Sequence, residues 1–308
     1  MQLPKNNLGV SRFPLMISTR PSLPKRKRRT PVTIIVGIIC EQSIVLASDS
    51  QTTAGTAKRW DSRKIRVVKF KNAPVLVADS GCADTASRAI EIFSDLGKEV
   101  EITDHRTVAD TADKAIRTLV DELRFAQGDC TMEELREFVL REELGCELMI
   151  AHLFEKKPYL YRIQSWVGFA NRVTTDWEAV GCAANLGGQI LTEYLKPGLH
   201  FGQVTAIAIL AVETAKKHDA YCGGPTRVGI LSRAYEDGDV EYDHAWIMPE
   251  DEVLDIVDVI QTELKPHRQK LLAALLMSLG KRTAKRIENM YNASSRGTLM
   301  SVDIKEES

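Results

Sequence analysis

Two Ile- and Val-rich segments near the start of the chain place the strongest constraint on how it can fold. They span residues 33–40 and 43–49 and are joined by a tight connection. A strand that is buried on both faces has a nearly continuous apolar sequence, so both segments are predicted strands of a sheet that is covered on each side. Residues 64–70 and 73–79 have a similar apolar character and predict two more strands.

Helices and strands then follow in separate runs along the chain. Apolar residues recur with helical periodicity over residues 83–99 and 106–126, and a short, highly charged helix is expected at 131–144. The elements expected after these are strands 147–154, 159–164 and 177–180, helices 187–195 and 201–218, and strands 226–232 and 240–246. Because strands and helices are segregated, the order predicts an α+β fold with four layers, an α-β-β-α sandwich.

The two ends of the chain differ from this core. Residues 1–32 carry eight Lys or Arg, five Pro and no acidic residue, which indicates a disordered basic leader, a prosegment or a misassigned start. An organelle transit peptide and a nuclear-localisation patch stay open for the same segment. A C-terminal helical extension is expected at 249–292, with a leucine stripe suited to packing or oligomer contact, and a disordered tail at 293–308.

Composition narrows the functional classes. A chain of 308 residues, 44% hydrophobic and 27% charged, can bury a sizeable core. The net charge of −1 gives no indication of a nucleic-acid partner, and no apolar run approaches the roughly 20 residues that span a bilayer. Six scattered cysteines without a CxxC pair indicate reduced thiols. The sequence therefore predicts a cytoplasmic protein without a cofactor, metal, membrane or nucleic-acid partner.

Four features of the sequence carry its chemistry. Thr33 opens the first strand, Asp49 lies sixteen residues later at the end of the second, and Lys64 begins the third. The segment Asp219-Ala-Tyr-Cys222-Gly-Gly comes much later, directly after the helix expected at 201–218. In this order and spacing they resemble the catalytic β-subunits of bacterial and archaeal 20S proteasomes and the related bacterial two-ring protease. Those proteins are N-terminal-nucleophile (Ntn) hydrolases, so the resemblance implies a threonine peptidase.

The resemblance covers residues 33–235, makes residues 33–248 an Ntn hydrolase domain, and implies a role for each matching residue. Thr33 is expected to be the first residue of the working chain, with its hydroxyl as nucleophile and its own α-amine as base. The Lys64 cation is expected to favour the ionised hydroxyl, and Asp49 to hold Lys64 in place. An internal Thr33 has an amide nitrogen, which cannot accept a proton, so an unprocessed chain is expected to be inert.

Further hydrogen bonds are expected around the amine. The resemblance implies that Asp219 and Cys222 position the amine together with a bridging water. Cys182, between Gly181 and Ala183, is expected to supply another hydrogen bond. The family has serine where this chain has Cys182 and Cys222, and thiols are weaker hydrogen-bond donors than hydroxyls.

The resemblance also implies where a substrate would bind. The backbone N–H of Ser80, in the loop that spans residues 79–84, is the expected oxyanion donor. The pocket for the residue before the cleaved bond is expected to be lined by Thr52, Thr53, Ala78 and Cys82. Gln51 and Val32 also depart from the family: Gln51 stands where many active members have arginine, and Val32 stands where self-cleaving precursors usually have glycine.

The resemblance leaves three functions open. The first is a threonine peptidase that acts on unfolded or peptide substrates inside a homo-oligomeric ring, its ATPase regulator, if any, unknown. The second is a catalytically silent ring or scaffold subunit, and the presence of both Thr33 and Lys64 argues against it. The third is a small-molecule Ntn amidohydrolase, a class that more often begins with Ser or Cys.

Overall fold

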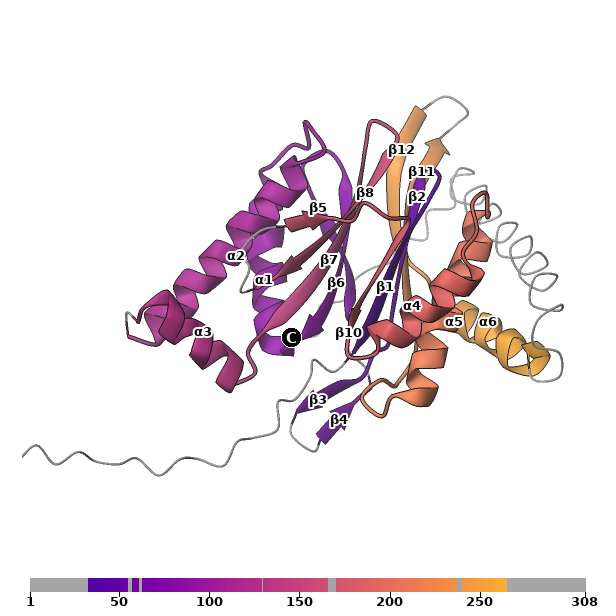
Figure 1. Cartoon of the computed structure of the whole chain (residues 1–308). Helices are drawn as coiled ribbons and strands as arrows, with labels where there is room; N and C mark the ends of the chain where they lie inside the picture. Colours follow the sequence, from indigo (N-terminus) through magenta and orange to yellow (C-terminus); the bar gives the residue numbers. More distant parts are fainter. Residues whose placement is uncertain are drawn as a thin grey trace, which may run out of the picture.

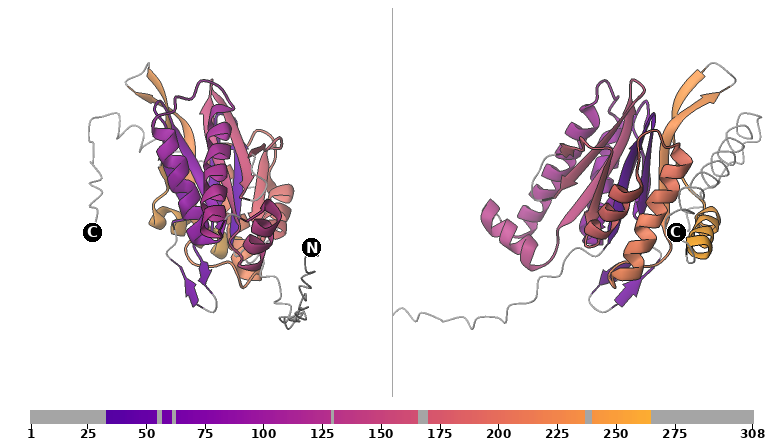
Figure 2. Two further views of the ribbon diagram at one scale, coloured as in Figure 1. Left: turned by 90° about the vertical axis from the view of Figure 1, so that its left-hand side faces the viewer. Right: turned by 45° about the vertical axis from the view of Figure 1, so that its right-hand side comes forward.

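Two five-stranded antiparallel sheets lie face to face, and helices cover the outer face of each (Figure 1). The computed structural model describes residues 33–54, 57–60, 63–128, 130–165, 170–236 and 240–264. The right-hand view of Figure 2 shows that the helical layers lie on opposite outer faces of the sheet pair. This arrangement is the predicted α+β fold with four layers, α-β-β-α, and that prediction is confirmed.

Each sheet is built mostly from neighbouring hairpins. In spatial order the first sheet consists of β10 (Trp177–Gly181), β1 (Ile34–Cys40), β2 (Ser43–Ser48), β11 (Arg227–Glu236) and β12 (Val240–Ile247). The second consists of β5 (Ile65–Lys69), β6 (Pro74–Gly81), β7 (Cys146–Phe154), β8 (Lys157–Gln164) and β9 (Ala170–Arg172). A separate hairpin, β3 (Thr52–Ala54) and β4 (Ala57–Arg59), projects from one end of the sheets (Figure 1).

The helices divide between the two sheets. On the second sheet lie α1 (Ala83–Lys98) and α2 (Thr107–Ala126), and α3 (Met132–Arg141) packs against α2. On the first sheet lie α4 (Ala184–Tyr194) and α5 (Phe201–His218), and α6 (Glu250–Leu264) packs against α5. Among the described residues, no helix is long and apolar enough to cross a membrane.

Strand β1 shows why the first apolar segment has no polar face. Ile34, Val36 and Ile38 pack against the layer formed by α4 and α5, while Ile35 points into the space between the sheets. All four side chains are completely buried, and each contributes roughly 1.5–3 kcal/mol of hydrophobic stabilisation. Alternation along the strand therefore places apolar residues on two covered faces.

The sheets pack closely at Gly37 in the middle of β1. A Cβ atom built there would lie 2.4 Å from the Met149 Sδ and 3.0 Å from a methyl carbon of Leu160, both on the second sheet. This position tolerates only glycine without repacking, because protein interiors have few voids. The two sheets are therefore closely spaced at this point of β1.

Most predicted elements are present, with ends displaced by a few residues. The sequence analysis missed β3, β4 and β9, which are three residues long and lie outside the main apolar core. Of the helical extension expected at 249–292, the structure describes α6, while residues 265–292 lie outside the described residues. The predicted leader at 1–32 and tail at 293–308 also lie outside them.

Candidate active site

Thr33 lies immediately before β1 and is completely buried. Gly181, at the end of the neighbouring strand β10, is aligned with Ile34. The backbone of Gly181 has a φ of +98°, and a Cβ atom there would lie 2.2 Å from the Thr33 carbonyl oxygen. Only glycine combines this left-handed conformation with so close an approach. Gly181 thus brings the turn after β10 directly against Thr33.

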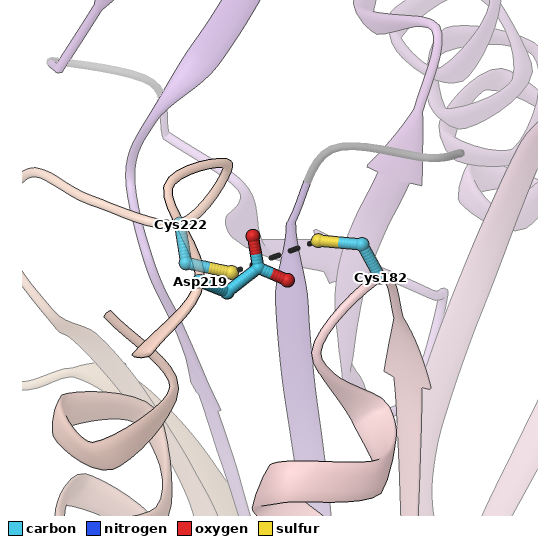
Figure 3. A group of neighbouring side chains, drawn as sticks. All are labelled: Cys182, Asp219 and Cys222. Carbon is cyan, nitrogen blue, oxygen red and sulfur yellow. Dashed lines mark hydrogen bonds between the residues drawn. The ribbon is translucent and has the colours of Figure 1, made fainter. Parts of the chain in front are cut away.

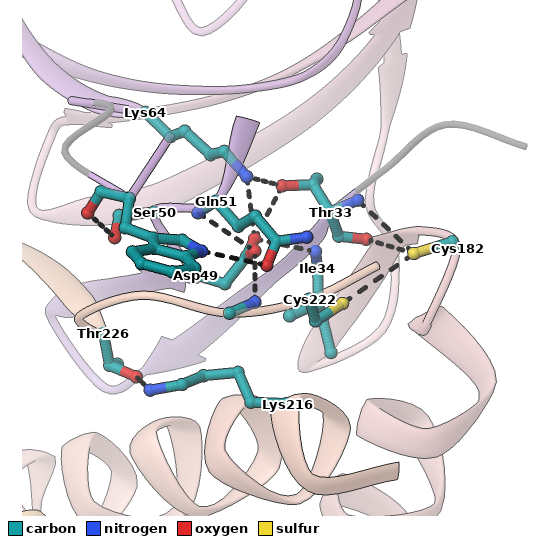
Figure 4. A network of polar contacts seen from close by, with 12 residues as sticks. Thr33, Ile34, Asp49, Ser50, Gln51, Lys64, Cys182, Lys216, Cys222 and Thr226 are labelled. Atoms are coloured by element: carbon teal, nitrogen blue, oxygen red, sulfur yellow. Dashed lines mark hydrogen bonds and ion pairs between the residues drawn. The ribbon is translucent and has the colours of Figure 1, made fainter. Parts of the chain in front are cut away.

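Asp49 is the acceptor on which the site converges (Figure 4). It follows β2 and is completely buried, with both carboxylate oxygens occupied. Oδ1 accepts from the Thr33 hydroxyl (2.6 Å), Lys64 Nζ (2.8 Å) and the Ile34 N–H (3.1 Å); Oδ2 accepts from the N–H groups of Gly223 (3.0 Å) and Gln51 (3.3 Å). A buried carboxylate needs such donors to offset its loss of hydration.

Lys64 completes a buried triad with Thr33 and Asp49. Its Nζ contacts both the Thr33 hydroxyl and the Asp49 carboxylate, and only 5% of the residue is exposed. The Lys64 carbonyl accepts from the Asp79 N–H at 3.0 Å, which anchors the chain at the start of β5. A cation held against a hydroxyl lowers the free energy of the ionised oxygen. The triad therefore has the charge arrangement needed to activate the threonine oxygen.

Cys182 contacts the Thr33 backbone on its other side. The Thr33 N–H donates to Cys182 Sγ at 3.3 Å, and the Cys182 thiol donates to the Thr33 carbonyl oxygen at 3.2 Å. The sulfur atoms of Cys182 and Cys222 lie 3.8 Å apart and share a hydrogen bond. That hydrogen bond lowers the pKa of Cys182 and raises the pKa of Cys222, so Cys182 is the thiol that ionises first.

Asp219 and Cys222 share a short loop after α5 (Figure 3). The Cys222 N–H donates to the Asp219 carbonyl oxygen at 3.1 Å, and the Tyr221 N–H donates to Asp219 Oδ1 at 2.8 Å. One side-chain oxygen of Asp219 and the sulfurs of Cys182 and Cys222 all lie within 4.8 Å of one another. The structure thus brings together the six residues predicted for the chemistry: Thr33, Asp49, Lys64, Cys182, Asp219 and Cys222.

The residues predicted to bind substrate are more scattered. Cys82 is the half-buried residue that precedes α1, while Thr52 and Thr53 lie on β3. Ser80 is near the end of β6 with 2% of its surface exposed, and its hydroxyl has no hydrogen-bond partner among the described residues. Ala78 lies in the apolar core between the sheets and has no exposed surface, so the structure does not bring it to the wall of an open pocket.

The comparisons with known proteins begin with the family model for proteasome subunits, which matches residues 32–231. The chain belongs to the proteasome subunit family. A curated relative in this family, proteasome subunit beta 1 of Thermococcus kodakarensis, is 24% identical over 210 residues, which span 67% of this chain and 91% of the relative.

Solved structures of similar fold include Anbu proteins. Anbu (ancestral beta-subunit) from Yersinia bercovieri gives a TM-score of 0.57 at 15% identity and covers 76% of this chain and 95% of its own. The helical assembly of the Anbu complex from Pseudomonas aeruginosa gives a TM-score of 0.56 at 15% identity. The match covers 83% of this chain and 96% of the Anbu chain. At this identity the likeness shows the fold, which is that of a proteasome-type Ntn hydrolase.

Sequence analysis missed Asp79, a buried carboxyl in this proteasome-family chain. It lies on β6, next to Ser80, with 6% of its surface exposed. Its Oδ1 accepts no hydrogen bond from any described residue, and the Arg66 guanidinium lies 3.8 Å away. Burial raises the pKa of Asp79 to about 6, partly opposed by the cations of Arg66 and Lys64. An aspartate at the end of an otherwise apolar strand was the available signal.

Gln51 links the site to the loop that carries Asp219. Its side-chain oxygen accepts from the indole N–H of Trp60 at 3.3 Å, and its side-chain amide donates to the Ala220 carbonyl at 3.5 Å. A Cβ atom on Gly223 would lie 2.4 Å from the same Gln51 oxygen. The side chain that departs from the family's arginine therefore holds the Asp219–Cys222 loop near Asp49.

Proposed function

We propose that this chain is a threonine-type peptidase with Thr33 as its nucleophile. The observation that carries the proposal is the position of the Thr33 hydroxyl between Asp49 and Lys64, in a site with almost no solvent exposure. A threonine hydroxyl is a weak nucleophile by itself and requires activation by a base or a charge. The buried Lys64 cation supplies the charge, and Asp49 orients both partners.

The base in this proposal is the α-amine that Thr33 gains when it becomes the first residue. The amine takes the hydroxyl proton as the oxygen attacks the substrate carbonyl carbon, and that proton then passes to the leaving nitrogen. A water molecule hydrolyses the resulting ester and restores the hydroxyl. We place the donors for the oxyanion at the end of β6, around Ser80, where the positive φ of Gly81 (+97°) redirects the backbone.

The described chain has Thr33 in a latent form. Its nitrogen belongs to a peptide bond and donates to Cys182, so it has no lone pair available for a proton. Thr33 is also fully buried. We therefore propose that the working enzyme arises when the bond before Thr33 is cut, which creates the amine beside the hydroxyl.

The proposed substrates are unfolded chains or peptides, hydrolysed inside a homo-oligomeric assembly. The support is the proteasome subunit family and the assembled state named for the Pseudomonas aeruginosa relative. A silent scaffold subunit is the second candidate. The contacts among Thr33, Asp49 and Lys64 disfavour it, because a purely structural subunit has no need for a lysine against a buried hydroxyl.

Intact mass spectrometry tests the proposal directly. The purified protein is expected to begin at Thr33 and to gain the mass of a peptide epoxyketone, a reagent that bonds to both the hydroxyl and the amine of an N-terminal threonine. Thr33→Ala is expected to abolish the adduct. Thr205→Ala is the matched control, because Thr205 is another completely buried threonine, located on α5.

A second variant separates chemistry from assembly. Lys64→Met keeps the length of the side chain but removes the charge, and it is expected to slow hydrolysis of a fluorogenic peptide by about 100-fold or more. A chain that begins at Thr33, assembles, and neither hydrolyses peptides nor forms the adduct would establish the scaffold function instead. If the purified protein keeps residues before Thr33, the chain can be made as a ubiquitin fusion. Removal of the ubiquitin then leaves Thr33 as the first residue.

A further inference from the structure

A cluster of two thiols and a carboxylate lies beside the Thr33 nitrogen. It consists of Cys182, Cys222 and Asp219 (Figure 3). Cys182 and Asp219 are partly exposed, which gives a path from solvent, whereas 5% of Cys222 is exposed. Peptidase chemistry does not require sulfur at this place, because a hydroxyl would hydrogen-bond to the amine more strongly. The donor set therefore invites another explanation.

The spacing of the two sulfurs fits a tetrahedral metal ion. A zinc–sulfur bond is about 2.3 Å long, and at a tetrahedral angle two such sulfurs lie about 3.8 Å apart. The observed separation of Cys182 Sγ and Cys222 Sγ is 3.8 Å. A disulfide would need the sulfurs about 2.05 Å apart, so the loops would have to move toward each other. The present geometry suits a bridging ion without such a movement.

Asp219 and the Thr33 nitrogen could provide the third and fourth ligands. The three ligand atoms lie within 4.8 Å of one another, and in a zinc site the Asp219 oxygen would lie roughly 3.6 Å from each sulfur. The Thr33 nitrogen lies 3.3 Å from Cys182 Sγ. As a peptide nitrogen it cannot ligate a metal, but as a free α-amine it has a lone pair. The hydrogen bond from the Tyr221 N–H to Asp219 Oδ1 orients the carboxylate.

We propose that Cys182, Cys222 and Asp219 bind Zn²⁺, that the free α-amine of Thr33 completes the site, and that the bound ion keeps the proposed peptidase inactive. Two thiolates with a nitrogen and an oxygen form a donor set typical of zinc. Binding releases one proton from each thiol, so the formal charge of the site stays at −1 before and after. An amine bonded to zinc cannot accept the hydroxyl proton, and this inhibitory part rests on the proposed function.

Zinc binding is measured first, on the purified chain that begins at Thr33, by competition with a chromophoric chelator. One equivalent per chain is expected, and cobalt(II) in its place is expected to show the near-ultraviolet absorption of thiolate-to-metal charge transfer. Cys182→Ser, Cys222→Ser and Asp219→Asn are each expected to weaken binding at least about tenfold. Cys130→Ser, at a half-buried thiol before α3, is the matched control and is expected to bind normally.

The absence of stoichiometric metal would overturn the site, as would binding that the changes at Cys182 and Cys222 leave intact. Circular dichroism identifies a variant that has lost its fold, and Asp219→Asn then serves as the decisive exchange because it conserves side-chain volume. These measurements do not depend on peptidase activity.

Inhibition is measured on the chain that begins at Thr33, with the epoxyketone as probe. Saturating Zn²⁺ is expected to slow adduct formation at least tenfold, and a chelator is expected to restore the rate. Equal rates with and without zinc would overturn the inhibitory part. If no adduct forms even with the chelator, the proposed peptidase function fails, while the cobalt spectrum still reports on the metal site.

Discussion

The buried carboxyl of Asp79 allows one quantitative prediction about stability. Its pKa is raised from 3.8 to about 6 because burial disfavours the charged form. A carboxyl whose pKa is raised in the folded state contributes stability that is fully present below 3.8 and is lost as the pH rises through 6. The difference between the two values, at 1.36 kcal/mol per pH unit, corresponds to about 3 kcal/mol of destabilisation above pH 7.

Asp79→Asn removes this cost while keeping the shape of the side chain. We expect the free energy of unfolding of the variant to exceed that of the wild type by about 2–3 kcal/mol at pH 8, and by roughly 0.5 kcal/mol at pH 4. Urea unfolding followed by tryptophan fluorescence measures both values, at equal protein concentration because assembly stabilises the folded state. Asp95→Asn is the control, since the hydrogen bond from Lys98 lowers the pKa of that exposed carboxyl.

Two outcomes would refute the reasoning. A gain that is the same at pH 4 and pH 8 would mean that the asparagine only packs better and that the charge is unimportant. A loss at pH 8 that disappears at pH 4 would mean that Arg66, 3.8 Å away, compensates the Asp79 charge fully. The control at Asp95 is not expected to stabilise the protein at pH 8.

Three further predictions concern pH, backbone space and the sheet interface. Burial lowers the pKa of His152 from 6.5 to about 4, so its contribution to stability is present above pH 6.5 and is lost as the pH falls towards 4. The free energy of unfolding is expected to fall by about 2 kcal/mol by pH 5. In urea titrations, His152→Gln should remove that loss. Gly181→Ala should destabilise by at least about 2 kcal/mol in urea and slow adduct formation at Thr33, whereas Gly198→Ala, also at positive φ but with open space around it, should cost about 1 kcal/mol and leave adduct formation unchanged. Gly37→Ala should lower the unfolding free energy by about 1–3 kcal/mol through overpacking between the sheets, and an unchanged urea midpoint would contradict the close contact described there.

The layered fold was predictable because its central strands have a continuous apolar sequence. The segment over β1 is apolar at every position because each face of the strand meets another layer. The hairpin of β3 and β4 has no such requirement, and its polar sequence gave no strand pattern. Its position depends on contacts such as the one from Lys58 Nζ to the Ala220 carbonyl at 2.8 Å, which join segments far apart in sequence.

The sequence predicted which residues form the candidate site but not the hydrogen bonds that join them. The resemblance named Asp49 as the partner of Lys64, but three of the five hydrogen bonds to Asp49 come from backbone N–H groups. A backbone donor such as the N–H of Gly223 cannot be recognised from the sequence, because every residue except proline has one. Cys182 and Cys222 are forty residues apart and form no recognisable metal motif, so only the folded chain shows that their sulfurs are neighbours.

The way in which Thr33 is held has a consequence for how the proposed peptidase is activated. Its hydroxyl, nitrogen and carbonyl are each bound by Asp49, Lys64 or Cys182, all of which follow it in the chain. None of these contacts depends on a residue that precedes Thr33. For the proposed peptidase, maturation is therefore a covalent event that leaves these contacts in place: the proposed inactive and active forms differ by one bond.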